Sequence, residues 1–468
     1  MKNRLLISVI IILTACLILI SGAVFFIGKN HLWEQAIARA TATLPNVDVT
    51  IQAAGDGGRD SDIPQADTTP EESIPSEIIS QMNTIQEQII YLRGLSPNGT
   101  FSRKILSTEQ LRQELIETFE NEMSAYDSWE YTLTLSIFGL LNEDFDIYHF
   151  HIDLLTEQIA GYYDHESQAM VLVAGTQFGG PERLTYAHEY THALQDQNFD
   201  IENGLGYNDE ACEGDSERCA AIESLLEGDA TLSETQWFLH YATDQDHADL
   251  MAFYNDMEMP NMDKAPAFLG EDLLFPYQYG YDFAQNLFER GGWEAVNQAY
   301  QNPPVSTEQI LHPERYPADV PLPVNLPDLL PILGDGWEEV DKDVIGEWYT
   351  YLILAFGLDE EARVNKSRSA RAAEGWEGDA YAVYNNAQNQ SAAMVFDAIW
   401  ETPTEAEEFA NTFITYATRR FGEPIEQNKL IIWKDENGIH SFYWKDTSTT
   451  WIFAPDQVTA ESIWRLLQ

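Results

Sequence analysis

The sequence is short of basic residues. It has 25 Lys plus Arg against 77 Asp plus Glu in 468 residues, which gives a formal net charge of −52. A surface of this charge repels phosphate groups, so nucleic acid is excluded as a partner. No EF-hand loop, phosphate-binding glycine loop, serine nucleophile elbow or internal repeat occurs in the chain. The sequence signals of calcium-loop proteins, P-loop enzymes and serine hydrolases are therefore missing.

Long apolar runs are also scarce, with one exception at the N-terminus. Lys2 and Arg4 precede an uncharged apolar run from Leu5 to Ile27, which is long enough to span a bilayer as a helix. We predict an uncleaved signal anchor over residues 1–30, with the N-terminus in the cytoplasm and the catalytic part outside it. The chain would then be a single-pass membrane protein with the lipid bilayer as a partner. The alternative is a lipoprotein anchored at Cys16, because Leu13–Cys16 resembles a lipoprotein processing box.

The strongest chemical signal is the motif His188-Glu189-Tyr190-Thr191-His192. Two histidines four residues apart share one face of a helix, where a single Zn²⁺ ion can accept both. The glutamate beside the first histidine is placed to act as a general base toward a water molecule. Residues 182–197 are compatible with a helix, and Pro181 is a favoured helix start. We therefore predict one catalytic zinc ion here; the alternative is a surface helix that carries two histidines by chance.

A catalytic zinc ion takes three protein ligands and leaves one position open. The best candidate for the third ligand is Glu227, within a second helical pattern at about 216–243. Glu223, one turn earlier, is a rival, and an ordinary solvated carboxylate remains the alternative for Glu227. Asp229 is the candidate for an acceptor that orients a ligating histidine.

These segments resemble the gluzincin type of zinc metallopeptidase, and more narrowly a group of poorly characterised, membrane-anchored bacterial proteins of that type. The resemblance covers roughly residues 90–316. It is carried by Gln158–Asp164 (QIAGYYD), Ala187–Gln197 (AHEYTHALQDQ), Leu226–Ala230 (LEGDA) and Pro304–Tyr316 (PVSTEQILHPERY). It implies His188, His192 and Glu227 as zinc ligands and Glu189 as the general base. One position departs from the family pattern: Thr231 stands where thermolysin-like gluzincins have an aspartate, and Asp229 is expected to take its place.

The chain is expected to be an α+β protein. Its predicted parts are the anchor (1–30), a largely disordered spacer (31–78), a mainly helical zincin-like metallopeptidase domain (79–320), a Pro-rich linker (321–336) and a small antiparallel α+β domain (337–468). In the last of these we expect a helix near 337–356 before the strands. Two strand-like runs, 158–164 and 168–174, predict a β-hairpin before the metal helix. The strand at 168–174 is expected to pair with an extended peptide substrate.

Further candidate residues follow from the chemistry of peptide hydrolysis. A metallopeptidase needs a donor for the oxyanion of the tetrahedral intermediate. His312 is the candidate, with Tyr316 and Tyr281 in reserve, and a buried structural histidine is the alternative. Cys212 and Cys219 are close enough in sequence for a disulfide, with two free thiols as the alternative.

The predicted function is thus a membrane-anchored, extracytoplasmic zinc metallopeptidase that acts on a peptide or protein substrate. The alternative is a non-catalytic anchored binding or adhesion protein with a structural or vestigial zinc site. The intact glutamate of the motif argues against that alternative, because a purely structural site does not need it. The identity of the substrate does not follow from the sequence.

Overall fold

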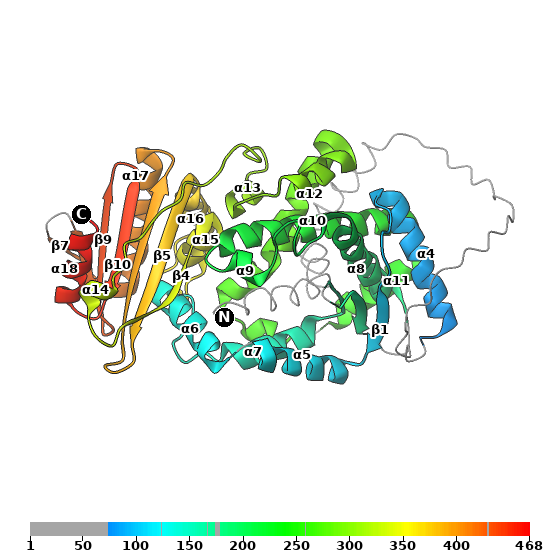
Figure 1. Cartoon of the computed structure of the whole chain (residues 1–468), viewed down its shortest axis with the longest axis horizontal. Helices are drawn as coiled ribbons and strands as arrows, with labels where there is room; N and C mark the ends of the chain where they lie inside the picture. The colour runs from blue at the N-terminus through cyan, green and yellow to red at the C-terminus, as the bar shows by residue number, and fades with distance from the viewer. Residues whose placement is uncertain (1–73, 123, 166, 174–177, 258, 428–429) are drawn as a thin grey trace.

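The computed structural model describes residues 74–122, 124–165, 167–173, 178–257, 259–427 and 430–468. A helical part with a small sheet lies beside a part built on a seven-stranded sheet (Figure 1). The helical part consists of α4 (Ser76–Arg93), β1 (Ser102–Leu106), α5 (Thr108–Glu122), α6 (Ala125–Phe138), α7 (Ile147–Gln158), β2 (Gly161–Asp164), β3 (Ala169–Val173), α8 (Gly180–Phe199), α9 (Asp209–Cys212), α10 (Ser216–Tyr241), α11 (Asp244–Asp256), η1 (Met262–Lys264), α12 (Ala267–Gln301) and α13 (Thr307–Leu311).

The second part follows without a break in the described chain. It consists of α14 (Leu330–Leu333), β4 (Glu338–Asp343), α15 (Gly346–Phe356), α16 (Lys366–Ala373), β5 (Trp376–Asn386), β6 (Ser391–Trp400), α17 (Pro403–Phe421), β7 (Ile425–Gln427), β8 (Leu430–Lys434), β9 (Ile439–Lys445), β10 (Ser448–Ala454) and α18 (Gln457–Leu466). The predicted α+β class is confirmed.

Helices α8 and α10 are the elements on which the candidate site depends. Pro181 lies in the first turn of α8, and the side chain of Glu182 accepts a hydrogen bond from the backbone N–H of Gly179 at 2.9 Å. This N-terminus explains why the helix begins where the sequence indicates. α8 packs against α4, α10 and α11, and α10 also packs along α12. α10 is therefore surrounded by other helices, and most of its polar side chains from Glu223 to Glu234 are buried.

The small sheet has the order β1-β3-β2. The predicted hairpin is confirmed, since β2 and β3 pair in antiparallel fashion. The role expected for residues 168–174 is wrong, however, because β3 also pairs with β1 along its whole length, from Ser102 opposite Ala169 to Leu106 opposite Val173. β3 has no open edge for a substrate strand among the described residues. β2 is the strand at the edge that lies against α8.

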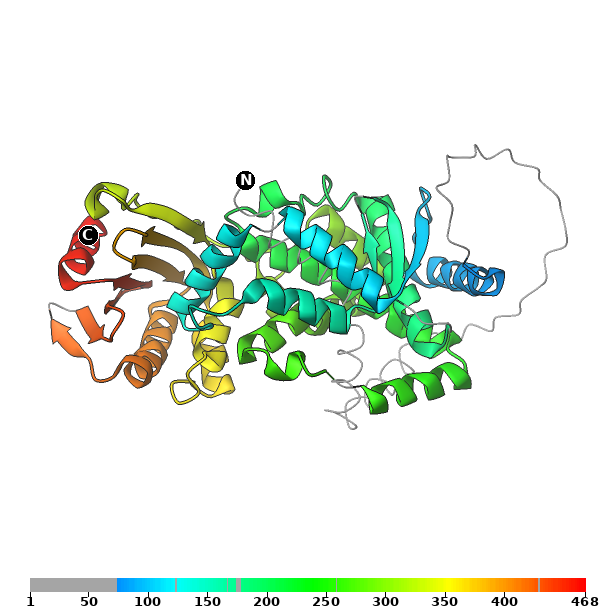
Figure 2. The ribbon, with the colours of Figure 1, turned by 90° about the horizontal axis from the view of Figure 1, so that it is seen from below.

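The seven-stranded sheet is antiparallel throughout, with the order β4-β5-β6-β10-β9-β8-β7. Side chains of β5 alternate between its two faces: Tyr381 and Val383 join the core under α15 and α17, whereas Ala382 and Tyr384 join the core under α18. Figure 2 shows α17 and α18 on opposite faces of this sheet. The helix expected near 337–356 is wrong in its first half, because β4 precedes α15. The two elements meet before Gly346, whose φ of +74° favours glycine.

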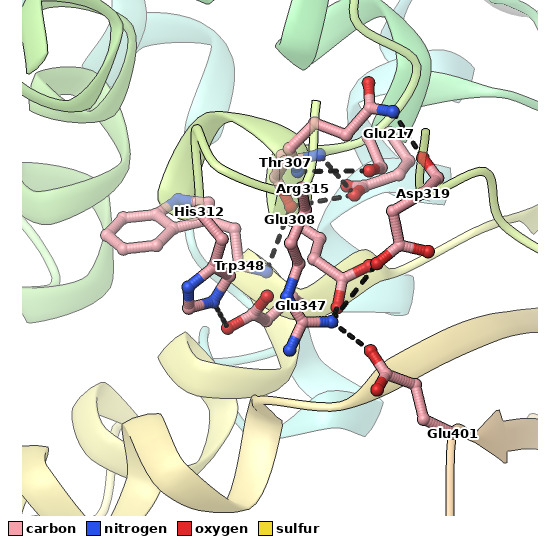
Figure 3. Close-up of polar contacts among 11 residues, drawn as sticks. Glu217, Thr307, Glu308, His312, Arg315, Asp319, Glu347, Trp348 and Glu401 are labelled. Atoms are coloured by element: carbon pink, nitrogen blue, oxygen red, sulfur yellow. Dashed lines mark hydrogen bonds and ion pairs between the residues drawn. The ribbon is translucent and has the colours of Figure 1, made fainter. Parts of the chain in front are cut away.

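The two parts share one hydrophobic core. It runs from Leu111 on α5 through Trp348 on α15 to Trp451 on β10. Polar contacts join them as well: Arg315, which follows α13, pairs with Glu308 at 2.8 Å and with Glu401 at the end of β6 (Figure 3). The second part is therefore packed tightly against the helical part through a shared core.

Among the described residues, no helix combines the length and the apolar character needed to cross a bilayer. The longest, α12, carries charged side chains along its course, such as Glu271, Asp282 and Glu294, and charges of this kind oppose insertion into a hydrocarbon core. The prediction of a single-pass membrane protein therefore has no support among the described residues. The segment 1–30, Cys16 and the spacer up to residue 73 lie outside the described residues.

Candidate metal centre

The structure brings His188, His192 and Glu227 together. The two histidines lie one turn apart on α8, and Glu227 faces them from α10. One ligand atom from each residue lies within 4.8 Å of the others, and all three side chains are buried. His188 Nε2 lies 3.0 Å from Glu227 Oε2, and His192 Nε2 lies 3.3 Å from Glu227 Oε1. Two imidazole nitrogens and a carboxylate therefore converge on one point, which is the donor set of a catalytic zinc site.

Acceptors on the far side of each imidazole hold it in the orientation that a ligand needs. His188 Nδ1 lies 3.0 Å from Glu234 Oε2, and His192 Nδ1 lies 2.8 Å from Gln195 Oε1. An ionised carboxylate and an amide oxygen only accept, so each Nδ1 carries the proton. Both Nε2 atoms then face Glu227. Carboxylate or carbonyl acceptors behind ligating histidines fix the tautomer in this way in metal sites generally.

Asp229 has a related but indirect role. It accepts hydrogen bonds from Gln195 Nε2 at 3.1 Å and Tyr300 OH at 2.6 Å, and it forms a fully buried, bidentate ion pair with Arg93. It reaches His192 only through Gln195. Asp229, the candidate acceptor that orients a ligating histidine, is thus linked to His192 at one remove. Glu234, seven residues and two helical turns beyond Glu227, contacts a ligand directly.

Glu189 lies beside the three candidate ligands and is 1% exposed. Its Oε1 atom has no hydrogen-bond partner among the described residues, and the same holds for His192 Nε2 and Glu227 Oε1. Buried polar atoms are rarely left unsatisfied. A cation and a water molecule at the point of convergence would satisfy all three. The residues present thus fit a zinc ion and its water.

The charges of the site shift the pKa values of its groups. Burial raises the pKa of Glu189 to about 7, against the opposing effect of His188 and His192. Burial lowers the pKa of His188, but hydrogen bonds to Glu227 and Glu234 outweigh this effect and raise that pKa well above its ordinary value. The pKa of Glu227 is lowered, because the two histidines outweigh its burial.

The structure does not bring His312 to this site. His312 caps the C-terminal end of α13, and its Nε2 lies 2.9 Å from Glu347 Oε1 (Figure 3). The first turn of α10 lies nearby, because Thr307 donates to Glu217; Glu227 is ten residues further along that helix, about 15 Å at helical rise. The prediction of His312 as the oxyanion donor is therefore wrong, and an ion pair with Glu347 is the physical reason for its placement.

The two reserve tyrosines are not at the centre either. The hydroxyl of Tyr316 donates to the backbone carbonyl of Asn302 at 2.6 Å. Tyr281 lies on α12, with Asp282 and Glu289 as its charged neighbours.

Two other tyrosines border the candidate ligands, and sequence reasoning missed both. Tyr207 is 1% exposed, its hydroxyl has no hydrogen-bond partner among the described residues, and its burial together with the charges of Glu223 and Glu227 raises its pKa well above the ordinary value. Tyr277 stacks on the ring of His188 with the centroids 6.3 Å apart. No local pattern around either residue indicates such a position, because each reaches the site from a different segment.

Cys212 and Cys219 are joined by a disulfide, as their spacing indicates.

A second group of converging carboxylates consists of Glu308, Asp319 and Glu401. Arg315 lies among these three and pairs with each of them (Figure 3). The guanidinium already supplies the cation, so this group is an ion-pair cluster.

Comparison with known proteins adds one finding. Residues 333–464 match the model of a domain of unknown function, DUF8575. This range covers the seven-stranded sheet with α15–α17 and most of α18, but less than a third of the chain. No curated protein and no solved structure matches the chain. The match therefore relates the second part of the chain to a family of unknown function.

Proposed function

We propose that this chain is a zinc-dependent metallopeptidase of the gluzincin type, with a zincin-like helical part around the metal centre. The observation that carries the proposal is the set of polar partners around the two imidazoles. Both Nδ1 atoms are engaged by Glu234 and Gln195, and both Nε2 atoms face Glu227. The buried, unpartnered oxygen of Glu189 beside them favours a catalytic over a structural site.

His188, His192 and Glu227 would hold the zinc ion. When bound, zinc in such a site makes a water acidic near neutral pH and polarises a carbonyl group. Glu189 accepts the proton of the attacking water and transfers it to the departing amine. Burial of all four side chains excludes bulk solvent and strengthens the electrostatic contacts of the site. β2 lies against α8, and the backbone N–H of Tyr163 on β2 contacts Glu189, so β2 borders the general base.

The role of Glu189 is tested by Glu189→Gln. The substitution keeps the shape of the side chain but removes its basicity. We expect the purified variant to contain about one zinc per chain by mass spectrometry. The rate of peptide cleavage should fall at least ~1,000-fold, because no general base then takes the proton of the attacking water. The exposed Glu202→Gln is the control for the charge change. Cleavage by Glu189→Gln within tenfold of the parent protein would reject the mechanism.

Tyr207 takes the place of His312 as the proposed oxyanion donor. Its hydroxyl is buried, has no partner among the described residues and lies in the field of Glu227. We expect Tyr207→Phe to lower kcat by about 100-fold with little change in KM, the size of effect seen when one oxyanion donor is removed. Zinc content should not change, and Tm should not fall, because the lost hydroxyl makes no hydrogen bond. A kcat within twofold of the parent value would exclude the role.

A further inference from the structure

A cavity of about 190 Å³ lies where the helical part meets the seven-stranded sheet. Its walls come from α6, α10 and α12 on one side and from β4, β5 and α15 on the other. Two lining residues border the candidate ligands. Glu223 lies one turn before Glu227 on α10, and the ring of Tyr277 stacks on that of His188. The cavity therefore begins beside the candidate metal centre and ends at the second part of the chain.

The lining carries charge of one sign. Seven lining residues are Asp or Glu, and none of the described residues that line it is Lys, Arg or His. Several of these acids are held by neighbours. Asp272 accepts hydrogen bonds from Trp348 Nε1 at 2.8 Å and Tyr349 OH at 2.5 Å. Asp341 and Asp343 accept hydrogen bonds from hydroxyl and backbone N–H groups. No cation of the lining compensates them.

Glu223 differs from these acids. It is 7% exposed, and it has no hydrogen bond or ion pair among the described residues. Burial, together with the charges of Glu227 and Asp272, raises its pKa well above the ordinary value. A buried carboxylate is unfavourable unless a cation or hydrogen-bond donors compensate it. Since the described residues provide neither, the position favours a ligand that brings a positive charge.

The remaining wall is aromatic. Phe275 and Trp348 lie with their ring centroids 4.5 Å apart, and Tyr277 lies on the same helix as Phe275. Aromatic faces attract ammonium and guanidinium groups and also pack against the methylene stem of a long side chain. The volume is below the 300–1,000 Å³ typical of sites for whole small molecules. It suits a single amino-acid side chain.

We propose that this cavity binds the Lys or Arg side chain of a peptide residue that flanks the cleaved bond, with Glu223 as its counter-ion. The inference rests on the proposed function only in taking the ligand to be a peptide substrate. The preference for a positively charged side chain follows from the acidic lining of the cavity. It also gives the second part of the chain a role. β4, β5 and α15 form the far wall of the specificity pocket.

The test measures binding without turnover. Positional peptide libraries with Lys, norleucine or Glu fixed at each position in turn are titrated into full-length, zinc-loaded Glu189→Gln protein. Norleucine matches the stem of Lys without its charge. At one position we expect the Lys library to bind at least tenfold more tightly than the norleucine library, and the Glu library to bind most weakly. In the Glu189→Gln/Glu223→Gln protein the Lys-to-norleucine ratio should fall to within about twofold. Glu223→Asp should keep part of the preference.

The exposed Glu407→Gln on α17 removes the same charge far from the cavity and should leave the ratio unchanged. Tm of each variant establishes that it is folded; Glu223→Gln should not unfold at a lower temperature, since it removes an uncompensated charge. Equal binding of Lys and norleucine libraries, or no binding of Lys libraries, overturns the pocket. If wild-type protein cleaves no peptide while the Lys preference depends on Glu223, the proposed function fails and the pocket stands. If cleavage occurs without such a preference, the function stands and the pocket fails.

Discussion

At the scale of single residues, the candidate ligands depend on partners outside the motif. Glu234 engages His188 Nδ1 directly, whereas Thr231, which occupies the position where the resembled family has an aspartate, has a hydroxyl without a hydrogen-bond partner in the described part of the chain. We expect Glu234→Gln to weaken zinc binding by 10- to 100-fold, the usual effect of losing a carboxylate behind a ligating histidine. Competition with a fluorescent chelator measures the change.

Thr231→Ala is the matched control for that prediction, because it alters the same helix without touching a ligand. Its zinc affinity should equal that of the parent protein. The reverse order of effects, with Thr231→Ala weakening zinc binding and Glu234→Gln leaving it unchanged, would contradict the assignment of Glu234 as the acceptor of His188.

The residues of the metal centre differ in how far the sequence could predict them. His188, Glu189 and His192 follow from local spacing on one helix, and Glu227 from the need for a third ligand. Gln195 and Arg93 carry no such signal. Gln195 is recognisable only once α10 lies beside α8, and Arg93 only once α4 packs against both. His312 shows the opposite error: its residue type suits an oxyanion donor, but the fold places it against Glu347.

At the scale of elements, the helices were easier to predict than the strands. The periodic patterns at 182–197 and 216–243 correspond to α8 and α10 within a few residues. β1 was missed because its partner β3 lies more than sixty residues away and the pairing is parallel, so no turn signal links them. The sequence of β4 does not indicate a strand, because it is short, its buried residues Val340 and Asp343 are three apart rather than two, and four of its six side chains are acidic.

The crossing of α10 and α12 sets the position of the cavity beside the ligands. A Cβ atom on Gly228 would lie 2.0 Å from the backbone carbonyl oxygen of Gly280. Gly228→Ala must therefore push α12, with Tyr277, away from Glu227. We expect a loss of about 3 kcal/mol in the free energy of unfolding and a clear fall in zinc affinity. Chemical denaturation and zinc titration measure the two effects.

Gly270 on α12 provides the control, because a Cβ atom there meets nothing within 4 Å. Gly270→Ala should stabilise the protein by about 0.5–1 kcal/mol, as expected for glycine replaced by alanine inside a helix. A Gly228→Ala protein as stable as the parent would mean that the two helices are not held in close contact at this point.

At the scale of the whole molecule, buried acids gather where its two parts meet. Burial raises the pKa of Asp343 to about 7, despite hydrogen bonds from the backbone N–H groups of Val344 and Ser216. Burial likewise raises the pKa of Asp379 to about 6, despite donors that include Ile345 N–H. Together with a formal net charge of −52, these groups couple the stability of the junction to pH.

The direction of that coupling follows from the sign of the shifts. Asp343 and Asp379 bind a proton more tightly in the folded chain than in the unfolded chain, where the pKa of an aspartate is about 3.9. Their contribution is fully present below pH 4 and is lost as pH rises through 6 to 7. In the presence of a chelator, which removes the contribution of zinc binding, Tm should therefore fall between pH 5 and pH 8. Asp343→Asn should flatten this slope, whereas the exposed Glu436→Gln should not. A Tm that rises over this range would show that the junction acids are ionised in the folded protein at pH 5.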